Sequence, residues 1–417
     1  MASAAWGWRL EAAFGSIAGM SVRLASWAGA GGVVLLLGVA AIVVWRTPGL
    51  TRRAAWALRR ASLRRWVARG LRVCDMVGPR GHRPRIRTVR ETPAGVALTM
   101  RVAAGHHSGH IAEIADGLAA ALRIREVRVL RDLADASIAH VVVVQRDAFA
   151  GQALSWPWAA ASRVSLWRPV PVGVDEEGHT VHVSLPEHNL LLGGEPGAGK
   201  SVALSLLVAA AALDVDASLT LLDGKQVELA AWAGSATRFV GPDMDDAADA
   251  LDELRAEMDV RYRRLLDAGR RKIEQGDGIG LHLVVIDELA FYLRGGTTAT
   301  RNRLQESLRD LVSRGRASGI VVVAATQKPS NEIVPTFIRD LFSFRLALRS
   351  TTPEASDTIL GQGWASQGFT ASSINPTARG VGFLLHEGGV PVKLRCYHLD
   401  DAQIAVIARR AESLRRR

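Results

Sequence analysis

Residues 194–201 combine a glycine-rich loop with a lysine and a hydroxyl, a combination that can bind nucleotide phosphates. They read GEPGAGKS and fit the spacing G-x-x-x-x-G-K-[ST]. Backbone amides of such a loop surround phosphate oxygens, the lysine reaches the β- and γ-phosphates, and the serine hydroxyl ligates Mg²⁺. The alternative is a plain glycine-rich turn. The loop predicts a site for ATP and Mg²⁺ formed by Gly194, Glu195, Pro196, Gly197, Ala198, Gly199, Lys200 and Ser201.

Two adjacent carboxylates follow another apolar run, LHLVVIDELA at 281–290. A phosphate-binding loop needs a carboxylate that positions the metal and a group that activates water. We expect Asp287 to hold the Mg²⁺ shell and Glu288 to orient and polarise the attacking water. The alternative is an acidic pair that ends a strand and caps the next helix.

Polar and basic side chains flank a third apolar run, GIVVVAAT at 319–326. Gln327 ends this run, where a polar side chain can contact the γ-phosphate. Arg314 and Arg316 precede it, and an arginine offered to a neighbouring subunit's nucleotide stabilises transition-state charge. The alternative for these arginines is a solvated helix end that favours cations. We take Gln327 as a further candidate catalytic residue and keep both Arg314 and Arg316 as candidates for the offered arginine.

These residues need a rigid scaffold, and the hydrophobic pattern indicates one. After residue 185, continuous apolar strands alternate with helices near 201–212, 245–268 and 300–314. This pattern predicts an α/β fold with a mostly parallel sheet covered on both faces. Upstream, strands and a helical stripe predict a small α/β domain at 92–150, and prolines and tryptophans mark a connector at 151–184. The α/β domain that carries the phosphate-binding loop is then expected at 185–417.

The N-terminal part of the chain has a different composition. Residues 28–45 carry no charge, and the length of this run is close to the roughly 20 residues with which a helix spans a bilayer. The run therefore predicts a transmembrane helix. A buried core helix and a signal peptide are the alternatives. Residues 1–27 place apolar side chains three or four apart, which favours an interfacial amphipathic helix over a disordered tail.

The arginines are concentrated around this predicted span. Residues 1–90 hold 16 arginines and two acidic residues, whereas the other 327 residues hold 36 basic and 39 acidic ones. Most of these arginines follow the span, so the positive-inside rule places the C-terminal bulk in the cytoplasm, at the inner face of the plasma membrane. The basic juxtamembrane segment, 46–91, is expected to bind anionic lipid at 46–90, with non-specific DNA contact as the alternative. Two cysteines without paired spacing indicate neither a disulfide framework nor a zinc site.

With these motifs in this order, the chain resembles the FtsK/SpoIIIE family of membrane-anchored DNA translocases. The resemblance covers roughly 95–405. It is most specific from Arg314 to Gly363, where Lys328 replaces an arginine of the family's ATQ-Arg-Pro-Ser signature. It implies a RecA-like motor, assembled as a homo-hexamer with ATP between subunits and duplex DNA in the central pore. It also selects Arg316, eleven positions before Gln327, as the catalytic arginine offered to a neighbouring subunit's nucleotide. With one predicted span, the chain is most similar to the transfer proteins of actinomycete conjugative plasmids.

Because residues beyond 90 carry no excess of positive charge, DNA contact must be confined to a few inward-facing residues. The segment FYLRGGTTATRNR, at 291–303, is the candidate pore loop, with flexibility from Gly295 and Gly296 and charge from Arg294, Arg301 and Arg303; a surface loop without a role is the alternative. We therefore expect a membrane-anchored ATPase that moves double-stranded DNA, serving plasmid transfer. The alternatives are chromosome segregation at division, protein secretion by an ATPase of the same superfamily, and a nucleotide-gated membrane scaffold.

Overall fold

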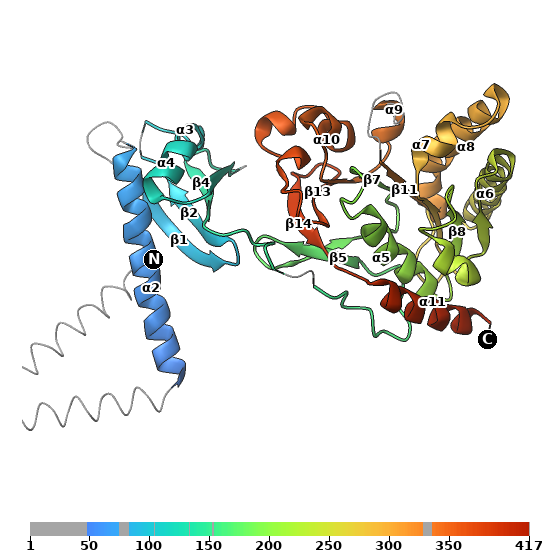
Figure 1. Ribbon diagram of the computed structural model, residues 1–417, viewed down its shortest axis with the longest axis horizontal. Helices are drawn as coiled ribbons and strands as arrows, with labels where there is room; N and C mark the ends of the chain where they lie inside the picture. The colour runs from blue at the N-terminus through green and yellow to red at the C-terminus, as the bar shows by residue number, and fades with distance from the viewer. Residues whose placement is uncertain are drawn as a thin grey trace, which may run out of the picture. The chain divides into compact units, whose positions relative to one another are not determined.

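The computed structural model describes residues 48–74, 83–103, 105–132, 134–151, 154–327 and 336–416. The chain divides into two compact units, Met1–Asp147 and Ala148–Arg417, which we call the small unit and the motor unit (Figure 1). The predicted span at 28–45 and the predicted amphipathic segment at 1–27 lie outside the described residues. Among the described helices, none is long and apolar enough to cross a membrane.

The small unit is an antiparallel sheet with helices on one face. Its strands pair in the order β1-β2-β4-β3. Alternate side chains of these strands form a core with α2 and α4, as expected for a sheet with one buried face. The elements are α2 (Pro48–Val73), β1 (Arg85–Thr92), β2 (Gly95–Arg101), α3 (Ser108–Glu113), α4 (Ala115–Leu122), β3 (Glu126–Arg131) and β4 (Ile138–Val144).

This unit begins earlier than residue 92, where the sequence pattern placed its start. The basic segment contains helix α2, and its Val67 and Leu71 are buried in the core of the unit. Three arginines of this segment, for which the sequence predicts contact with lipid, lie against strand β1. Arg59 pairs with Glu91 at 2.7 Å, and Arg60 Nε and Arg64 Nη2 each donate to a β1 carbonyl at 3.0 Å. Apolar residues between the arginines give the helix a face that packs, so the segment at 46–91 is not a separate domain.

The motor unit is built on a ten-stranded sheet, in the order β6-β5-β14-β13-β12-β7-β11-β10-β8-β9 within the described residues. The run from β12 to β9 is parallel throughout, and the run from β12 to β6 is antiparallel. The strands are β5 (Val170–Asp175), β6 (Thr180–Val183), β7 (Leu190–Gly193), β8 (Ser218–Leu222), β9 (Arg238–Val240), β10 (His282–Ile286), β11 (Ile320–Thr326), β12 (Phe344–Leu348), β13 (Val381–His386) and β14 (Val392–Cys396).

Helices cover both faces of the parallel strands, which confirms the predicted α/β fold with a mostly parallel sheet. Along β10, Leu283 and Val285 face one hydrophobic core, and Val284 and Ile286 face the other. The first core includes α5 (Lys200–Leu213), α11 (Asp401–Arg415) and the short η2 (Ala230–Ser235). The second includes α6 (Met244–Asp267), α7 (Leu289–Arg294), α8 (Thr298–Ser318) and α10 (Pro353–Leu360) (Figure 1). The shorter elements are α9 (Thr336–Arg339), η3 (Ala365–Gln367) and η4 (Ala371–Ser373).

The predicted connector, 151–184, belongs to the motor unit. It contributes β5 and β6 to the antiparallel part of the sheet, and Trp156 is buried with its indole N–H donating to the Pro171 carbonyl at 2.9 Å. Phe149 also packs in a motor core, so the unit starts at Ala148 and not at residue 185. The prolines and tryptophans that indicated a linker are therefore part of the packed domain.

Two buried polar side chains, Asn189 and His282, fasten helices to the sheet. Asn189, which is fully buried, donates to the Val312 carbonyl of α8 at 2.8 Å and accepts from the Val322 amide of β11 at 2.7 Å. Glu257 of α6 contacts the Nδ1 of His282 in β10 at 2.8 Å. Because buried polar groups are costly without partners, both contacts fix the helices against the strands that lead to the site.

Candidate active site

Neighbouring parallel strands deliver the predicted site residues to one edge of the sheet. Strand β11 lies between β7 and β10, and all three run in the same direction. The phosphate-binding loop follows β7, Asp287 and Glu288 follow β10, and Gln327 follows β11. The structure therefore brings these four predicted features together at the carboxyl edge, where open α/β sheets bind ligands.

The phosphate-binding loop is shaped by glycines and braced by two other segments. Gly197 and Gly199 have φ angles of 77° and 105°, which side chains with a Cβ rarely adopt. A Cβ on Gly199 would lie 2.8 Å from the Gly380 amide nitrogen, so this glycine is needed for close packing as well. The Gly380 amide donates to the Ala198 carbonyl at 2.9 Å, and the Glu195 amide donates to the Arg349 carbonyl at 3.0 Å. These contacts fix the loop from both sides.

Lys200 begins helix α5 and turns its ammonium group into the loop. Its Nζ donates to the carbonyls of Gly194 at 2.6 Å and Glu195 at 2.9 Å, and the residue is only 8% exposed. Burial lowers the pKa of Lys200 to about 8. A partly desolvated cation in the middle of a ring of backbone groups is well placed to attract a polyphosphate.

Asp287 forms a buried carboxylate pair with Asp223, a residue that the sequence analysis did not select. Burial and the nearby charge of Asp223 raise the pKa of Asp287 to about 7. Asp287 Oδ1 accepts from the Gly224 amide at 3.2 Å, and Asp223 Oδ2 accepts from the Leu229 amide at 2.8 Å. A signal was present, since Asp223 ends the apolar run SLTLLD and strand β8 is next to β10.

The donor set at this edge fits a divalent cation. Two buried carboxylates repel each other unless positive charge lies nearby, and Mg²⁺ prefers oxygen ligands. Asp287 and the hydroxyl of Ser201, the second residue of α5, are the groups that would hold it. Asp223 already accepts hydrogen bonds from the amides of Lys225 and Leu229, so its contribution is to shape the turn and to add negative charge.

Glu288 is held rigidly between two strands. Its Oε1 accepts from the Thr326 hydroxyl at 3.0 Å and from the Ala290 amide at 3.3 Å, and its Oε2 accepts from the Gln327 amide at 3.0 Å. Glu288 therefore caps helix α7, as the alternative interpretation proposed, and is also fastened to the end of β11. A carboxylate fixed in this way beside a phosphate-binding loop can orient water and accept its proton.

Comparison with known proteins decides the family. Residues 159–367, half of the chain, match the FtsK/SpoIIIE family. The chain belongs to the FtsK/SpoIIIE family. The motor unit of this FtsK/SpoIIIE-family chain is accordingly a P-loop ATPase domain.

Relatives and solved structures agree with this assignment. The DNA translocase FtsK of Lactiplantibacillus plantarum is 25% identical over 303 residues, which cover 68% of this chain and 38% of that protein. The chain thus spans about two-fifths of the length of the curated relatives it matches. The pCW3 conjugation coupling protein TcpA, solved in its monomer form with ATPγS, has a TM-score of 0.56 at 20% identity, covering 84% of this chain and 99% of that one. EssC (ATPases 2 and 3) from Geobacillus thermodenitrificans has a TM-score of 0.52 at 14% identity, covering 64% and 51%. These structures share the fold.

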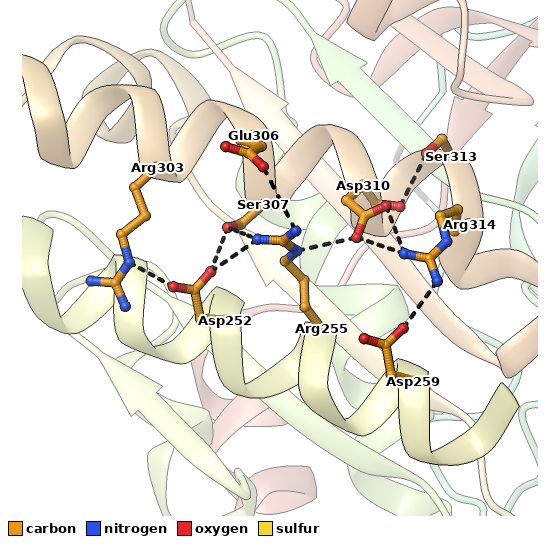
Figure 2. Close-up of polar contacts among 9 residues, drawn as sticks. All are labelled: Asp252, Arg255, Asp259, Arg303, Glu306, Ser307, Asp310, Ser313 and Arg314. Atoms are coloured by element: carbon orange, nitrogen blue, oxygen red, sulfur yellow. Dashed lines mark hydrogen bonds and ion pairs between the residues drawn. The ribbon is translucent and has the colours of Figure 1, made fainter. Parts of the chain in front are cut away.

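Arg316 of this FtsK/SpoIIIE-family chain lies away from the phosphate-binding loop of its own chain. It sits in the last turn of α8, before β11 begins, and therefore at the amino edge of the sheet. Its Nε donates to the Glu187 carbonyl at 2.6 Å, and its Nη2 lies 3.5 Å from a Glu387 carboxylate oxygen. The neighbouring Arg314 pairs with Asp310 and Asp259, each at 3.0 Å (Figure 2). A role for Arg316 on another subunit's nucleotide stays a prediction.

The candidate pore loop differs from the expected flexible basic segment. Residues 295–297 form a short turn between α7 and α8, and a Cβ on Gly295 or Gly296 would press on Met244 of α6. Arg303 lies within α8 and pairs with Asp252 at 2.5 Å and Asp249 at 2.7 Å, both on α6. The glycines therefore allow close packing, and Arg303 braces two helices. Arg294 is exposed, and the Arg301 guanidinium donates to the Thr298 hydroxyl of its own helix at 3.2 Å.

Figure 2 shows that Arg303 is part of a longer row of polar contacts between α6 and α8. Arg255 of α6 reaches Asp310 at 3.1 Å, and the Ser307 hydroxyl donates to Asp252 at 2.5 Å. Individual exposed ion pairs contribute little to stability, but a row along one helix interface also fixes its register. The row holds α8, which joins the turn after α7 to strand β11, against α6.

Proposed function

We propose that this chain is an ATP-driven translocase of double-stranded DNA that works at the inner face of the plasma membrane in plasmid transfer. The observation that carries the proposal is the placement of Glu288, which contacts Thr326 and Gln327 at the sheet edge that also presents the phosphate-binding loop. A protein that only binds nucleotide does not need such a carboxylate, so a passive scaffold is disfavoured. The family membership directs the motor towards DNA.

The residues of the site divide the work of hydrolysis among them. Backbone amides of the loop and Lys200 bind the phosphates of ATP, and Ser201 with Asp287 would hold Mg²⁺, which supplies charge neutralisation at the phosphates. The Glu288 carboxylate orients a water for attack on the γ-phosphate and accepts its proton. Since the amide of Gln327 is hydrogen-bonded to Glu288, a change at the γ-phosphate is transmitted to the end of β11.

DNA as cargo rests on the relatives and on the distribution of charge. The relatives are DNA translocases by name, and residues beyond 90 carry 36 basic against 39 acidic groups, so DNA contact must be local. Arg303 is fixed to α6, so the candidates from the selected segment are Arg294, which is exposed, and Arg301, which is partly exposed. Their position beside the α7–α8 turn puts them close in sequence to Glu288.

Plasmid transfer and membrane attachment rest on separate observations. The fold of the conjugation coupling protein TcpA is matched over almost its whole length. The uncharged run at 28–45, followed by arginines, supports a single membrane span with the motor in the cytoplasm. Contacts with anionic lipid are limited to arginines that do not brace β1, such as the exposed Arg65 and Arg69. A homo-hexamer is proposed from the family resemblance, which implies a ring; in such a ring Arg316 would act on the nucleotide of a neighbouring copy.

The deciding experiment measures ATP hydrolysis by the full chain in detergent, with and without linear duplex DNA, over a range of salt concentrations. We expect DNA to increase the rate, and Lys200→Ala is the matched control that removes hydrolysis. No stimulation at any salt concentration would refute DNA as the cargo and favour protein. Arg316→Ala should lose activity alone and regain part of it when mixed with Lys200→Ala subunits; no recovery would contradict a role in trans.

A further inference from the structure

One residue of the phosphate-binding loop has the wrong charge for its surroundings. Glu195 places a carboxylate in a loop that is otherwise built to receive a polyanion. The Glu195 carboxylate is paired with the guanidinium of Arg349, and its Oε2 accepts from the Thr351 hydroxyl at 2.9 Å. Both charged side chains are mostly buried, with 22% of Glu195 and 21% of Arg349 exposed. The pair is therefore shielded from water more than an ordinary surface ion pair is.

The sheet itself brings Arg349 to this position. Strand β12 is parallel to β7, with Ala347 opposite Gly193, so the residues after β12 lie beside the loop after β7. The Glu195 amide donates to the Arg349 carbonyl at 3.0 Å, which repeats the contact through the backbone. The Glu195 carbonyl accepts from Lys200 Nζ at 2.9 Å. Hydrogen bonds and an ion pair thus connect Arg349, Glu195 and the ammonium group of Lys200, which is proposed to bind the phosphates.

Like charges that approach each other in a poorly solvated site repel strongly. An unpaired carboxylate at Glu195 would oppose the binding of a nucleotide polyphosphate, and it would also compete with the phosphates for Lys200. We propose that Arg349 is a positioning residue for nucleotide binding, which neutralises Glu195 and keeps its carboxylate turned towards the end of β12. This inference rests on the proposed function, because it assigns a residue to the binding of ATP.

A second role for Arg349 would have different consequences. In this second role, Arg349 contacts the phosphates directly, and Glu195 only holds the guanidinium beside the site while the nucleotide is absent. In that case, removal of Glu195 would not compensate for the loss of Arg349. If Arg349 acts by neutralising Glu195, removal of both charges restores a loop that accepts the nucleotide. The double variant therefore separates the two roles.

The test is equilibrium binding of a fluorescent ATP analogue to the full chain, compared with Arg349→Ala, Glu195→Gln, the double variant and Arg349→Lys. We expect Arg349→Ala to raise Kd by about tenfold or more at low salt, with the difference from the unchanged chain shrinking as salt screens the repulsion. The double variant should bind within about threefold of the unchanged chain, and Arg349→Lys should recover part of the affinity. Thr351→Val, which removes a neutral hydrogen bond to the same carboxylate, is the control and should have a small effect.

The outcomes are separable. An unchanged Kd in Arg349→Ala, or a double variant as weak as Arg349→Ala, would overturn the inference. So would a binding defect that is independent of salt. Circular dichroism and thermal unfolding of each variant show whether it is folded, and in a folded variant the kinetic defect should lie in KM and not in kcat. Failure of the unchanged chain to bind the analogue would count against the proposed function instead.

Discussion

Replacing Glu288 with glutamine removes the proposed proton acceptor but keeps most of the contacts that position the side chain. The amide oxygen of glutamine can accept from the Gln327 amide in place of Oε2. The amide nitrogen can donate to the Thr326 hydroxyl, which then serves as acceptor. Only the contact from the Ala290 amide, the longest of the three at 3.3 Å, loses its acceptor. We expect a loss of folding stability of about 1 kcal/mol at most.

The effect on turnover should be much larger than the effect on stability. General base catalysis contributes a factor of about 10² to 10⁴, which corresponds to about 3–5 kcal/mol in the activation free energy. We therefore expect Glu288→Gln to lower kcat by that factor while the Kd for an ATP analogue stays within about threefold. Turnover and binding should respond differently because glutamine occupies the position of the Glu288 side chain. The described hydrogen bonds of that side chain go to Ala290, Thr326 and Gln327 and not to the phosphate-binding loop.

The assay combines analogue binding with single-turnover release of phosphate from the same preparation. Thr326→Val is the matched control: it removes one of the donors to Glu288 and leaves the carboxylate in place, so its rate should fall far less than that of Glu288→Gln. Turnover by Glu288→Gln within about fivefold of the unchanged chain would refute the assignment of the base. Loss of analogue binding together with turnover would refute the claim that the contacts survive.

The remaining predictions concern stability and DNA contact. Burial opposes ionisation of Glu257, but its contacts with His282 and Arg261 together outweigh burial and hold the pKa of Glu257 at about 2, below the ordinary 4.5. The resulting stability is present above pH 4.5 and is lost as the pH falls towards 2. Glu257→Gln should therefore lower the free energy of unfolding by about 2 kcal/mol at pH 7, a value that allows for screening of a partly exposed side chain, and by progressively less in acid. A constant difference in unfolding midpoints from pH 7 to pH 3 would contradict this prediction. Asn189→Ala leaves the buried Val322 amide without its acceptor and removes a second hydrogen bond to the Val312 carbonyl. It should cost about 2–4 kcal/mol in denaturant unfolding, and a loss below about 1 kcal/mol would show that the site relaxes. Arg301→Ala should weaken duplex binding and reduce its salt slope by about one, while Arg303→Ala leaves that slope unchanged; equal effects in filter binding would restore Arg303 as a DNA contact.

The parallel half of the motor unit could be predicted because its strands are continuous apolar runs that end in functional residues. LHLVVIDE, for example, contains both the buried strand and the two carboxylates that follow it. The antiparallel half could not be predicted in the same way, since β5 and β6 come from a segment rich in prolines and tryptophans. Strand β14, the partner of β5, lies more than 200 residues further along the chain. Such pairing is decided by tertiary contacts, which local periodicity does not report.

Parts of the site also depended on contacts between distant residues. Asp223 was visible as the end of an apolar run, but its role follows only from the adjacency of β8 and β10. Arg303 was basic and close to two glycines, which suggested DNA contact, whereas its partners on α6 are about fifty residues away. Charge and spacing in the sequence indicate which residues can bind a ligand, but they do not show which of them already have a partner within the fold.

The segment from Glu288 to Gln327 begins and ends at the same contact, since the carboxylate at its start accepts from the amide at its end. It contains α7, α8 and β11, so this contact closes a loop of chain whose outer helix is fastened to α6. Coupling between two sites is reciprocal. A nucleotide that strengthens the Glu288 contact would stabilise α8, and a more stable α8 would strengthen nucleotide binding by the same free energy. If nucleotide binding strengthens this contact, substitutions at the α6–α8 interface should change nucleotide affinity from a distance.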